Sequence, residues 1–299
     1  MSSKIELIKQ LRTKFGCSLN QAVKSLNESG NDIVQAEKTL QTILSSDNAA
    51  KISKAMGKGE GSEGLIGSVV LHNGFPITRG IPAMNRARGG LAQLSCQSDF
   101  VGRTDEFKKL VEDVTHSLSF LVDANGFKDV DIAGGVLEAP LIASSPDSTP
   151  ATTSHQSIQD AITSTIAKVG ENITLKRFTA FNLPGAKSEQ SPLRALGQFT
   201  HSTQSNSQMN SNSPVQLGLL AALVDLEVSG SANQDAVNQL SRKIARQSVA
   251  MDCDTVEQLE EQELLGGVDA QTVKAYLNEW TAQNHLESVQ VKDFRRWGL

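Results

Sequence analysis

The spacing of apolar residues changes between residues 90 and 121, and this change limits the folds that the chain can adopt. Residues 90–98 alternate apolar and polar side chains, which is the pattern of a half-buried strand. Residues 65–72 form another apolar run that ends at a turn signal, and they predict a second strand. After Thr104, a predicted N-cap, apolar residues follow helical spacing: Phe107, Leu110, Val111, Val114, Leu118 and Leu121.

A second unit of the same kind follows later in the chain. A helical stripe ends near Gly170, and residues 172–181 predict a strand. Residues 215–227 form a nearly continuous apolar run, which predicts a strand buried on both faces, and residues 235–250 predict a helix. Residues 288–299 predict a last extended segment. Two strand pairs with associated helices indicate an α+β fold with a duplicated core of antiparallel strands.

Residues 4–45 carry three short helical patterns, with Gly16 and Gly30 at the expected helix ends. They predict a three-helix module that resembles a ubiquitin-associated domain. In such domains, a loop like Phe15-Gly16 docks an apolar patch of a partner. Alternatively, Phe15 closes the core of the small module, and these residues alone do not separate the two interpretations.

The predicted domain organisation follows from these patterns and from the polar stretches between them. The boundaries are 1–46 for the three-helix module, 47–63 for a linker, 64–138 for the N-subdomain of the core, 139–156 for a flexible Ser/Thr/Pro-rich connection, 157–263 for the C-subdomain with a polar loop at 202–214, and 264–299 for a C-terminal helix and strand.

The composition narrows the classes of partner. The net charge of -5 argues against a broad nucleic-acid interface, so we expect no direct nucleic-acid binding. No apolar run approaches the length that spans a bilayer, and we expect no membrane partner. Cys17, Cys96 and Cys253 match no disulfide or zinc spacing and predict reduced, buried thiols.

The sequence offers little enzymatic chemistry. Residues Gly59 to Gly64 satisfy the GxGxxG pattern, but a predicted strand follows them instead of a helix, and Glu60 and Glu63 would repel phosphates. A flexible linker is therefore favoured over a nucleotide-binding enzyme. The five histidines show no ligand spacing. We predict no catalytic residues, no metal and no cofactor.

The connection after residues 90–98 holds an acid and an aromatic residue, Asp99 and Phe100. Connections run through water, so a Phe there needs apolar cover from its own chain or from another protein. The sequence leaves this question open.

Three segments in the same order resemble the elongation factor Ts family. They are IKQLRTKFGCSLNQAVKSLNESGNDIVQAEKTL at 8–40, LSCQSDFVGRTDEFKKLV at 94–111, where Ser98 replaces the family's Thr in Thr-Asp-Phe-Val, and AKVGENITLKRF at 167–178, where Val169 replaces Ile. The resemblance implies a guanine-nucleotide exchange factor, not an enzyme, whose partner is elongation factor Tu. The rival interpretation is a ubiquitin-binding adaptor that uses the N-terminal module.

The resemblance also implies the residues that bind the partner. Asp99 and Phe100 would wedge near the nucleotide and Mg²⁺ site of the partner. The other predicted contacts are Arg12, Leu19, Val169, Gly170 and His201. The family pattern around the histidine is Tyr-x-His-Gly, whereas this chain has Phe199-Thr200-His201-Ser202.

Two departures point to an organellar member of the family. Bacterial members insert a long helical arm where this chain has only residues 251–267, and the loops 75–89 and 202–214 are enlarged. We therefore predict localisation in the mitochondrial matrix.

Overall fold

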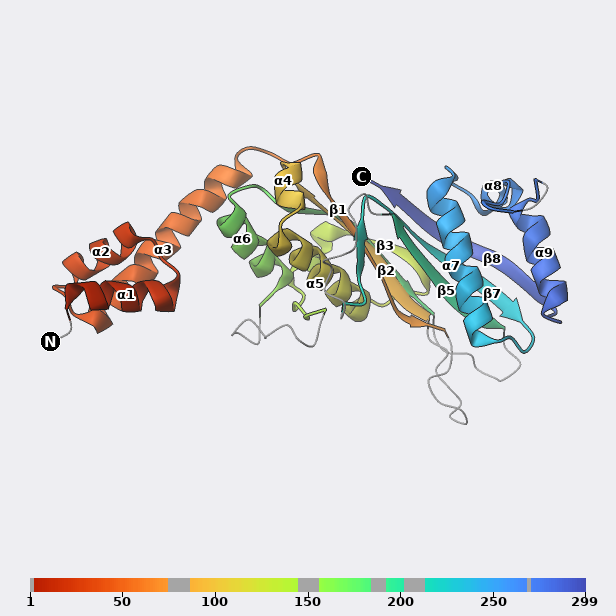
Figure 1. Cartoon of the computed structure of the whole chain (residues 1–299), viewed down its shortest axis with the longest axis horizontal. Helices are drawn as coiled ribbons and strands as arrows, with labels where there is room; N and C mark the ends of the chain where they lie inside the picture. Colours follow the sequence, from red (N-terminus) through yellow and green to blue (C-terminus); the bar gives the residue numbers. More distant parts are fainter. Residues whose placement is uncertain (1–2, 75–86, 145–155, 184–191, 202–212, 268–269) are drawn as a thin grey trace. The chain divides into compact units, whose positions relative to one another are not determined.

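The structure is a computed structural model that describes residues 3–74, 87–144, 156–183, 192–201, 213–267 and 270–299 (Figure 1). The chain forms two compact units, residues 1–59 with 166–172 and residues 60–165 with 173–299. No helix in the described ranges has both the length and the apolar character needed to cross a membrane.

The first unit contains three helices, α1 (Lys4–Phe15), α2 (Leu19–Glu28) and α3 (Ile33–Met56). Ser3 and Ser18 begin α1 and α2 with reciprocal capping boxes, and Asp32 caps α3. Gly16 ends α1 in the left-handed conformation, with φ of 61°, which a residue with a side chain rarely adopts. The helices enclose a small core: Leu11, Cys17, Ala22, Leu26, Ala36 and Leu40.

The larger unit begins with a five-stranded antiparallel sheet in the order β3-β4-β2-β1-β6. Its strands are β1 (Glu63–Asn73), β2 (Ala87–Cys96), β3 (Gly126–Val130), β4 (Thr174–Asn182) and β6 (Gln216–Gly218). The helical segments are α4 (Asp99–Gly102), α5 (Asp105–Leu121), α6 (Ile158–Val169) and the short 3-10 turns Ile132–Gly134 and Val136–Glu138. The last residues of α6, from Ile166 on, belong to the first unit. Helix α5 packs closely on β1 and β2, because Gly67 and Gly90 leave room for its side chains.

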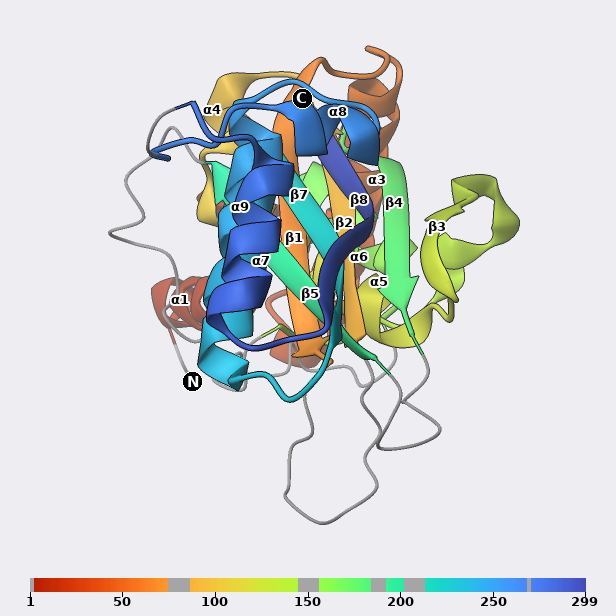
Figure 2. The same ribbon diagram turned by 90° about the vertical axis from the view of Figure 1, so that its right-hand side faces the viewer.

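A three-stranded antiparallel sheet follows, with the order β5-β7-β8. Its strands are β5 (Leu193–His201), β7 (Leu220–Ser229) and β8 (Ser288–Gly298). Helices α7 (Gln234–Ala250), α8 (Val256–Glu261) and α9 (Val273–Gln283) complete this part (Figure 2). One face of the sheet packs on α7 and α9 through an apolar cluster that includes Val224, Leu226, Leu240, Ile244, Leu277 and Phe294.

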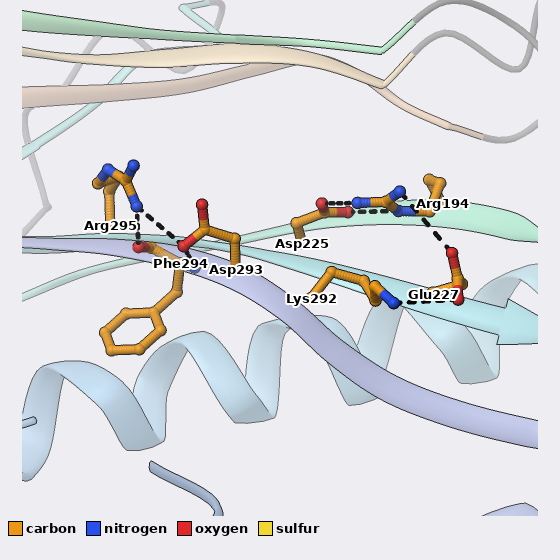
Figure 3. A network of polar contacts seen from close by, with 7 residues as sticks. All are labelled: Arg194, Asp225, Glu227, Lys292, Asp293, Phe294 and Arg295. Atoms are coloured by element: carbon orange, nitrogen blue, oxygen red, sulfur yellow. Dashed lines mark hydrogen bonds and ion pairs between the residues drawn. The ribbon is translucent and has the colours of Figure 1, made fainter. Parts of the chain in front are cut away.

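The other face of the three-stranded sheet packs against the five-stranded sheet, through Ile66, Leu91, Phe181, Leu196, Leu223 and Trp297. On that face lies a polar network that crosses all three strands (Figure 3). Arg194 on β5 bonds Asp225 on β7, with Nε 3.1 Å from Oδ1, and Lys292 on β8 lies 3.5 Å from Glu227. Burial raises the pKa of Asp225, and the Arg194 guanidinium opposes that rise.

The predicted α+β fold with a duplicated core is confirmed, since each half places a strand pair against a 17-residue helix, α5 or α7. The three predicted N-terminal helices are present, and α3 continues to Met56 through the first part of the predicted linker 47–63. All three cysteines are buried and free, as expected. The domain boundaries remain a prediction.

Three details of the predicted strands were wrong. Residues 172–181 were expected to belong to the second strand pair, but β4 pairs with β2 and β3 in the first sheet, and the strand beside β7 is β5. Residues 90–98 were expected to be half-buried, but β2 is buried on both faces because it lies between α5 and the second sheet. Leu94 on one face is 0% exposed, and Ser95 on the other face is 2% exposed. Residues 215–227 were expected to form one strand, but the run divides at Leu219, so that β6 joins one sheet and β7 the other. Most of the connection 139–156 and of the loops 75–89 and 202–214 lies outside the described residues.

Candidate functional site

The connection between β2 and α5 is an ordered turn that is fixed at both ends. The Ser98 side chain accepts a hydrogen bond from the Val101 backbone N–H at 3.4 Å and so begins the short helix α4. The Thr104 hydroxyl donates to the Val101 carbonyl at 2.8 Å and accepts from the Phe107 N–H at 3.3 Å. Thr104 therefore ends α4 and begins α5 with one side chain.

Phe100 projects from this turn into solvent. Its side chain is 79% exposed, whereas its neighbour Val101 is 7% exposed and anchors α4 to the core. The sequence left open whether the chain itself covers the ring, and the structure shows that most of it is open. An exposed Phe on a turn that is held on both sides forms a preformed apolar projection.

Asp99 lies beside Phe100 and pairs with Arg103, whose Nη2 is 3.0 Å from the Asp99 Oδ2. Both side chains are at least half exposed, so the pair adds little to stability, and it places a guanidinium beside the Asp99 carboxylate. Arg103 was not among the predicted site residues. Its spacing of four residues from Asp99 in a helical turn is the signal that could have found it.

Arg12 and Leu19 flank the connection between α1 and α2. Arg12 is exposed in the last turn of α1, and Leu19 is 52% exposed as the first residue of α2. Phe15, between them, is half-buried and packs against the small core of this unit. The module thus presents an exposed cation and an exposed apolar side chain near one connection.

Val169 and Gly170 mark the end of α6. Gly170 has φ of 75°, and its N–H donates to the Ile166 carbonyl at 2.8 Å, which is a helix-ending geometry. Gly170 is exposed and Val169 is partly exposed. The helix stop that these residues form leaves their surfaces accessible.

His201 is the exposed last residue of β5, and its carbonyl accepts from the Leu219 N–H at 3.1 Å. The strand registers place it at the same end of the sheets as α4. Gly218, beside Leu219, pairs with Ile66 on β1, and Glu63 at the start of β1 pairs with Cys96 just before α4. Three residues of a strand span about 10 Å.

The predicted residues thus fall into two sets. Asp99, Phe100 and His201 belong to the larger unit and share one end of its sheets. The others lie in the first unit: Arg12, Leu19, Val169 and Gly170.

The described residues offer no constellation for a metal, since no three His, Cys, Asp or Glu side chains gather there. The GxGxxG stretch leads into strand β1, as expected, and Glu60 within it pairs with Lys176. This geometry lacks the helix N-terminus that a pyrophosphate requires.

Comparisons with known proteins agree on one family. The family model described as Elongation factor TS matches residues 97–265, which is more than half of the chain. Elongation factor Ts, mitochondrial, of Coprinopsis cinerea is 30% identical over 99% of this chain and 91% of its own length. The protein of the same name from Laccaria bicolor is 30% identical over 98% of this chain and 90% of its own length. Elongation factor Ts of Aquifex aeolicus is 29% identical over 61% of this chain.

Proposed function

The chain belongs to the elongation factor Ts family, and we propose that it is a guanine-nucleotide exchange factor that binds elongation factor Tu and promotes the release of GDP. The resemblance seen in the sequence is confirmed by the family match and by relatives similar over nearly the whole chain. Those relatives are named mitochondrial, which confirms the predicted mitochondrial localisation and a place in translation elongation.

The observation that carries the proposal is the exposure of Phe100 on a turn fixed by Ser98 and Thr104. A rigid apolar group that inserts into another protein can loosen that protein's ligand, if it fits the ligand-free state better than the ligand-bound state. Burial of a Phe ring in a pocket of the partner contributes about 2 kcal/mol. Asp99 adds a carboxylate beside the ring, paired with Arg103, which would act on the loops around the partner's Mg²⁺ and nucleotide.

Exchange without covalent chemistry follows from differential binding. The factor must bind nucleotide-free elongation factor Tu more tightly than the GDP complex, so that its binding weakens the hold on GDP. Coupling is reciprocal, and GDP or GTP must therefore weaken the hold on the factor by the same ratio. The final equilibrium between nucleotide states is unchanged.

The remaining predicted residues would supply further affinity for the partner. Arg12 and Leu19 are exposed on the helical module, Val169 and Gly170 at the end of α6, and His201 at the end of β5. The comparisons give no support to the alternative of a ubiquitin-binding adaptor.

The test measures release of a fluorescent GDP analogue from mitochondrial elongation factor Tu, with and without the chain. Acceleration that saturates with the concentration of the chain is expected, and unlabelled GDP should dissociate the complex on a size-exclusion column. Absence of any acceleration, in a preparation where a known exchange factor accelerates release, would end the proposal. A ubiquitin titration of the same chain tests the rejected alternative.

A further inference from the structure

The glycine-rich stretch before β1 has a close contact that the proposed function does not use. Gly61 lies just before β1, Gly64 is the second residue of β1, and both lie against the end of β2, where that strand leads into α4. We propose that these two glycines are positioning residues that set the place of Asp99 and Phe100 by allowing the backbone of residues 61–64 to lie directly on residues 94–97. The inference rests on the proposed function, because it concerns the same wedge.

Gly61 makes the closer approach. A Cβ at this position would lie 1.8 Å from the Cys96 carbonyl oxygen, 2.2 Å from its carbon and 2.6 Å from the Gln97 nitrogen. Side-chain atoms do not approach backbone atoms to these distances, and the atoms met are backbone, which has no rotamer to change. A methyl group at residue 61 must therefore displace the chain at Cys96 and Gln97, or be displaced with its own strand.

Gly64 makes a second contact one step along the same pair of strands. Its φ is 157°, and a Cβ there would lie 2.1 Å from the Leu94 carbonyl oxygen and 2.9 Å from the Ser95 Cα. Its own carbonyl oxygen lies on the α4 side, 4.0 Å from where a Cβ of Gly102 would be. The backbone of Gly64 therefore lies against the end of β2 and close to Gly102 of α4.

Only a few residues connect the backbone that Gly61 and Gly64 contact with Asp99 and Phe100, and they are held by hydrogen bonds. The Cys96 thiol donates to the Ser98 carbonyl at 3.2 Å, and the Ser98 side chain begins α4. Val101 and Gly102 are buried, so the position of α4 depends on how it packs on the core. A displacement at Cys96 shifts Ser98 and changes this packing, and functional groups such as Phe100 must be held to about 0.5 Å to act.

This positioning role accounts for the GxGxxG pattern of residues 59–64, to which the sequence alone assigns no function. The pattern satisfies GxGxxG, yet the structure places two of its three glycines against backbone instead of a phosphate. Gly59 has φ of 82° and nothing within 4 Å of its Cβ position, so it allows a turn, and its carbonyl accepts a hydrogen bond from the Asn172 Nδ2 at 2.9 Å.

The test compares Gly61→Ala and Gly64→Ala with two glycine controls of the same unit. Gly134 matches Gly61: its φ is not left-handed and the nearest atom to its Cβ position is 3.8 Å away. Gly126 matches Gly64: its φ is positive, at 83°, but nothing lies within 4 Å. The rate of GDP release at saturating factor is expected to fall at least several-fold in Gly61→Ala and Gly64→Ala. The half-saturating concentration should change less than the rate, because the other contacts remain.

A double-variant cycle with Phe100→Ala separates positioning from general damage. If the glycines act through Phe100, Gly61→Ala should cost little further exchange in the Phe100→Ala background. Independent, multiplying effects would overturn the inference, as would full exchange by Gly61→Ala and Gly64→Ala. Unfolding of both variants would also overturn it, since it would assign the glycines to the stability of the unit. If Phe100→Ala keeps full exchange, both the proposed wedge and this inference are wrong. If Phe100→Ala loses exchange while both glycine variants keep it, the inference is wrong and the proposed wedge is retained.

Discussion

The two halves of the larger unit make the same step from strand to helix in different ways. In the second half, β7 reaches α7 through residues 230–233, and Asn233 caps the helix. In the first half, β2 reaches α5 through residues 97–104, and Thr104 caps the helix. The first connection is twice as long, and the added length is α4, which carries Asp99 and Phe100.

The comparison of the two connections shows which residues are needed to join strand to helix and which residues are additional. The second connection shows that a short polar turn is enough to place a 17-residue helix on a sheet of this unit. The extra turn is therefore not needed to join the strand to the helix, although its Val101 is buried, and it exposes an aromatic ring to water. A costly exposure that the twin element avoids is best explained by a contact with another molecule.

Shortening the connection between β2 and α5 to the length of the connection between β7 and α7 should have the largest effect on nucleotide exchange. Deletion of Asp99 to Gly102 is expected to reduce stimulated GDP release to the spontaneous rate, because it removes the whole wedge. Loss of the buried Val101 should lower the free energy of unfolding by about 2 kcal/mol. Nucleotide release and thermal unfolding, measured on the same preparation, check both effects. Strong exchange by the folded deletion variant would contradict the comparison.

Removal of the ring alone should have the next largest effect. Phe100→Ala is expected to lower exchange about tenfold, which corresponds to about 1.4 kcal/mol of lost interaction with the partner. The midpoint of thermal unfolding should stay unchanged, because the ring is 79% exposed. Phe120 offers a matched control, since it is 56% exposed near the other end of α5. Phe120→Ala should keep full exchange, and equal losses in the two variants would remove the special place of Phe100.

The two helix caps allow a direct test of the paired connections. Thr104→Ala and Asn233→Ala should each lower the free energy of unfolding by about 1 kcal/mol. Only Thr104 also holds α4, through its 2.8 Å hydrogen bond to the Val101 carbonyl. Thr104→Ala should therefore lower exchange several-fold, and Thr104→Ser should restore it. An equal loss of exchange in Asn233→Ala would show that the effect comes from stability alone.

The smallest expected effect concerns α5 and α7 and the way in which stability depends on pH. Helix α5 buries Glu112, and burial, helped by the charge of Asp113 and opposed by Lys108 and Lys109, raises the pKa of Glu112. The buried polar residues of α7 are Ser241, Gln247 and Ser248, which do not ionise. The two helices thus differ in their response to pH.

The direction of this response follows from proton linkage. Because the pKa of Glu112 is higher in the folded state, the folded state holds the proton more tightly, and the free energy of unfolding falls as the pH rises above the ordinary range of a glutamate. Glu112→Gln should lose this part of the pH dependence, so that its stability relative to the natural chain improves from pH 4 towards pH 7. Urea unfolding at a series of pH values measures it. A constant difference across the series would contradict the raised pKa.

Much of the fold could be predicted from periodicity and cap residues. The three N-terminal helices follow from their apolar spacing and from Gly16, and α5 follows from Thr104 and the helical stripe after it. The break at Leu219 could not be predicted, because one apolar run serves two sheets and burial on both faces looks the same in each. Strand β3 was missed because residues 126–130 are partly exposed and carry only a weak apolar pattern.

The candidate site, too, could be predicted from the sequence only in part. An aromatic residue on a connection could be recognised in the sequence, and so could the Ser98 cap of its turn. Whether the ring points inwards or outwards depends on the burial of Val101 and Gly102, which only the packed structure gives. The contacts of Gly61 and Gly64 depend on the register of β1 and β2, which joins residues far apart in the chain.

A fluorine probe at residue 100 tests the central claim most directly. A 4-fluorophenylalanine placed there by site-specific incorporation reports the surroundings of the ring in solution by fluorine NMR. Addition of nucleotide-free elongation factor Tu should move the resonance and shield it from a soluble paramagnetic agent, and an excess of GDP should return it to its free position. A complex that forms while the resonance stays in place and open to the agent would contradict insertion of Phe100 into the partner.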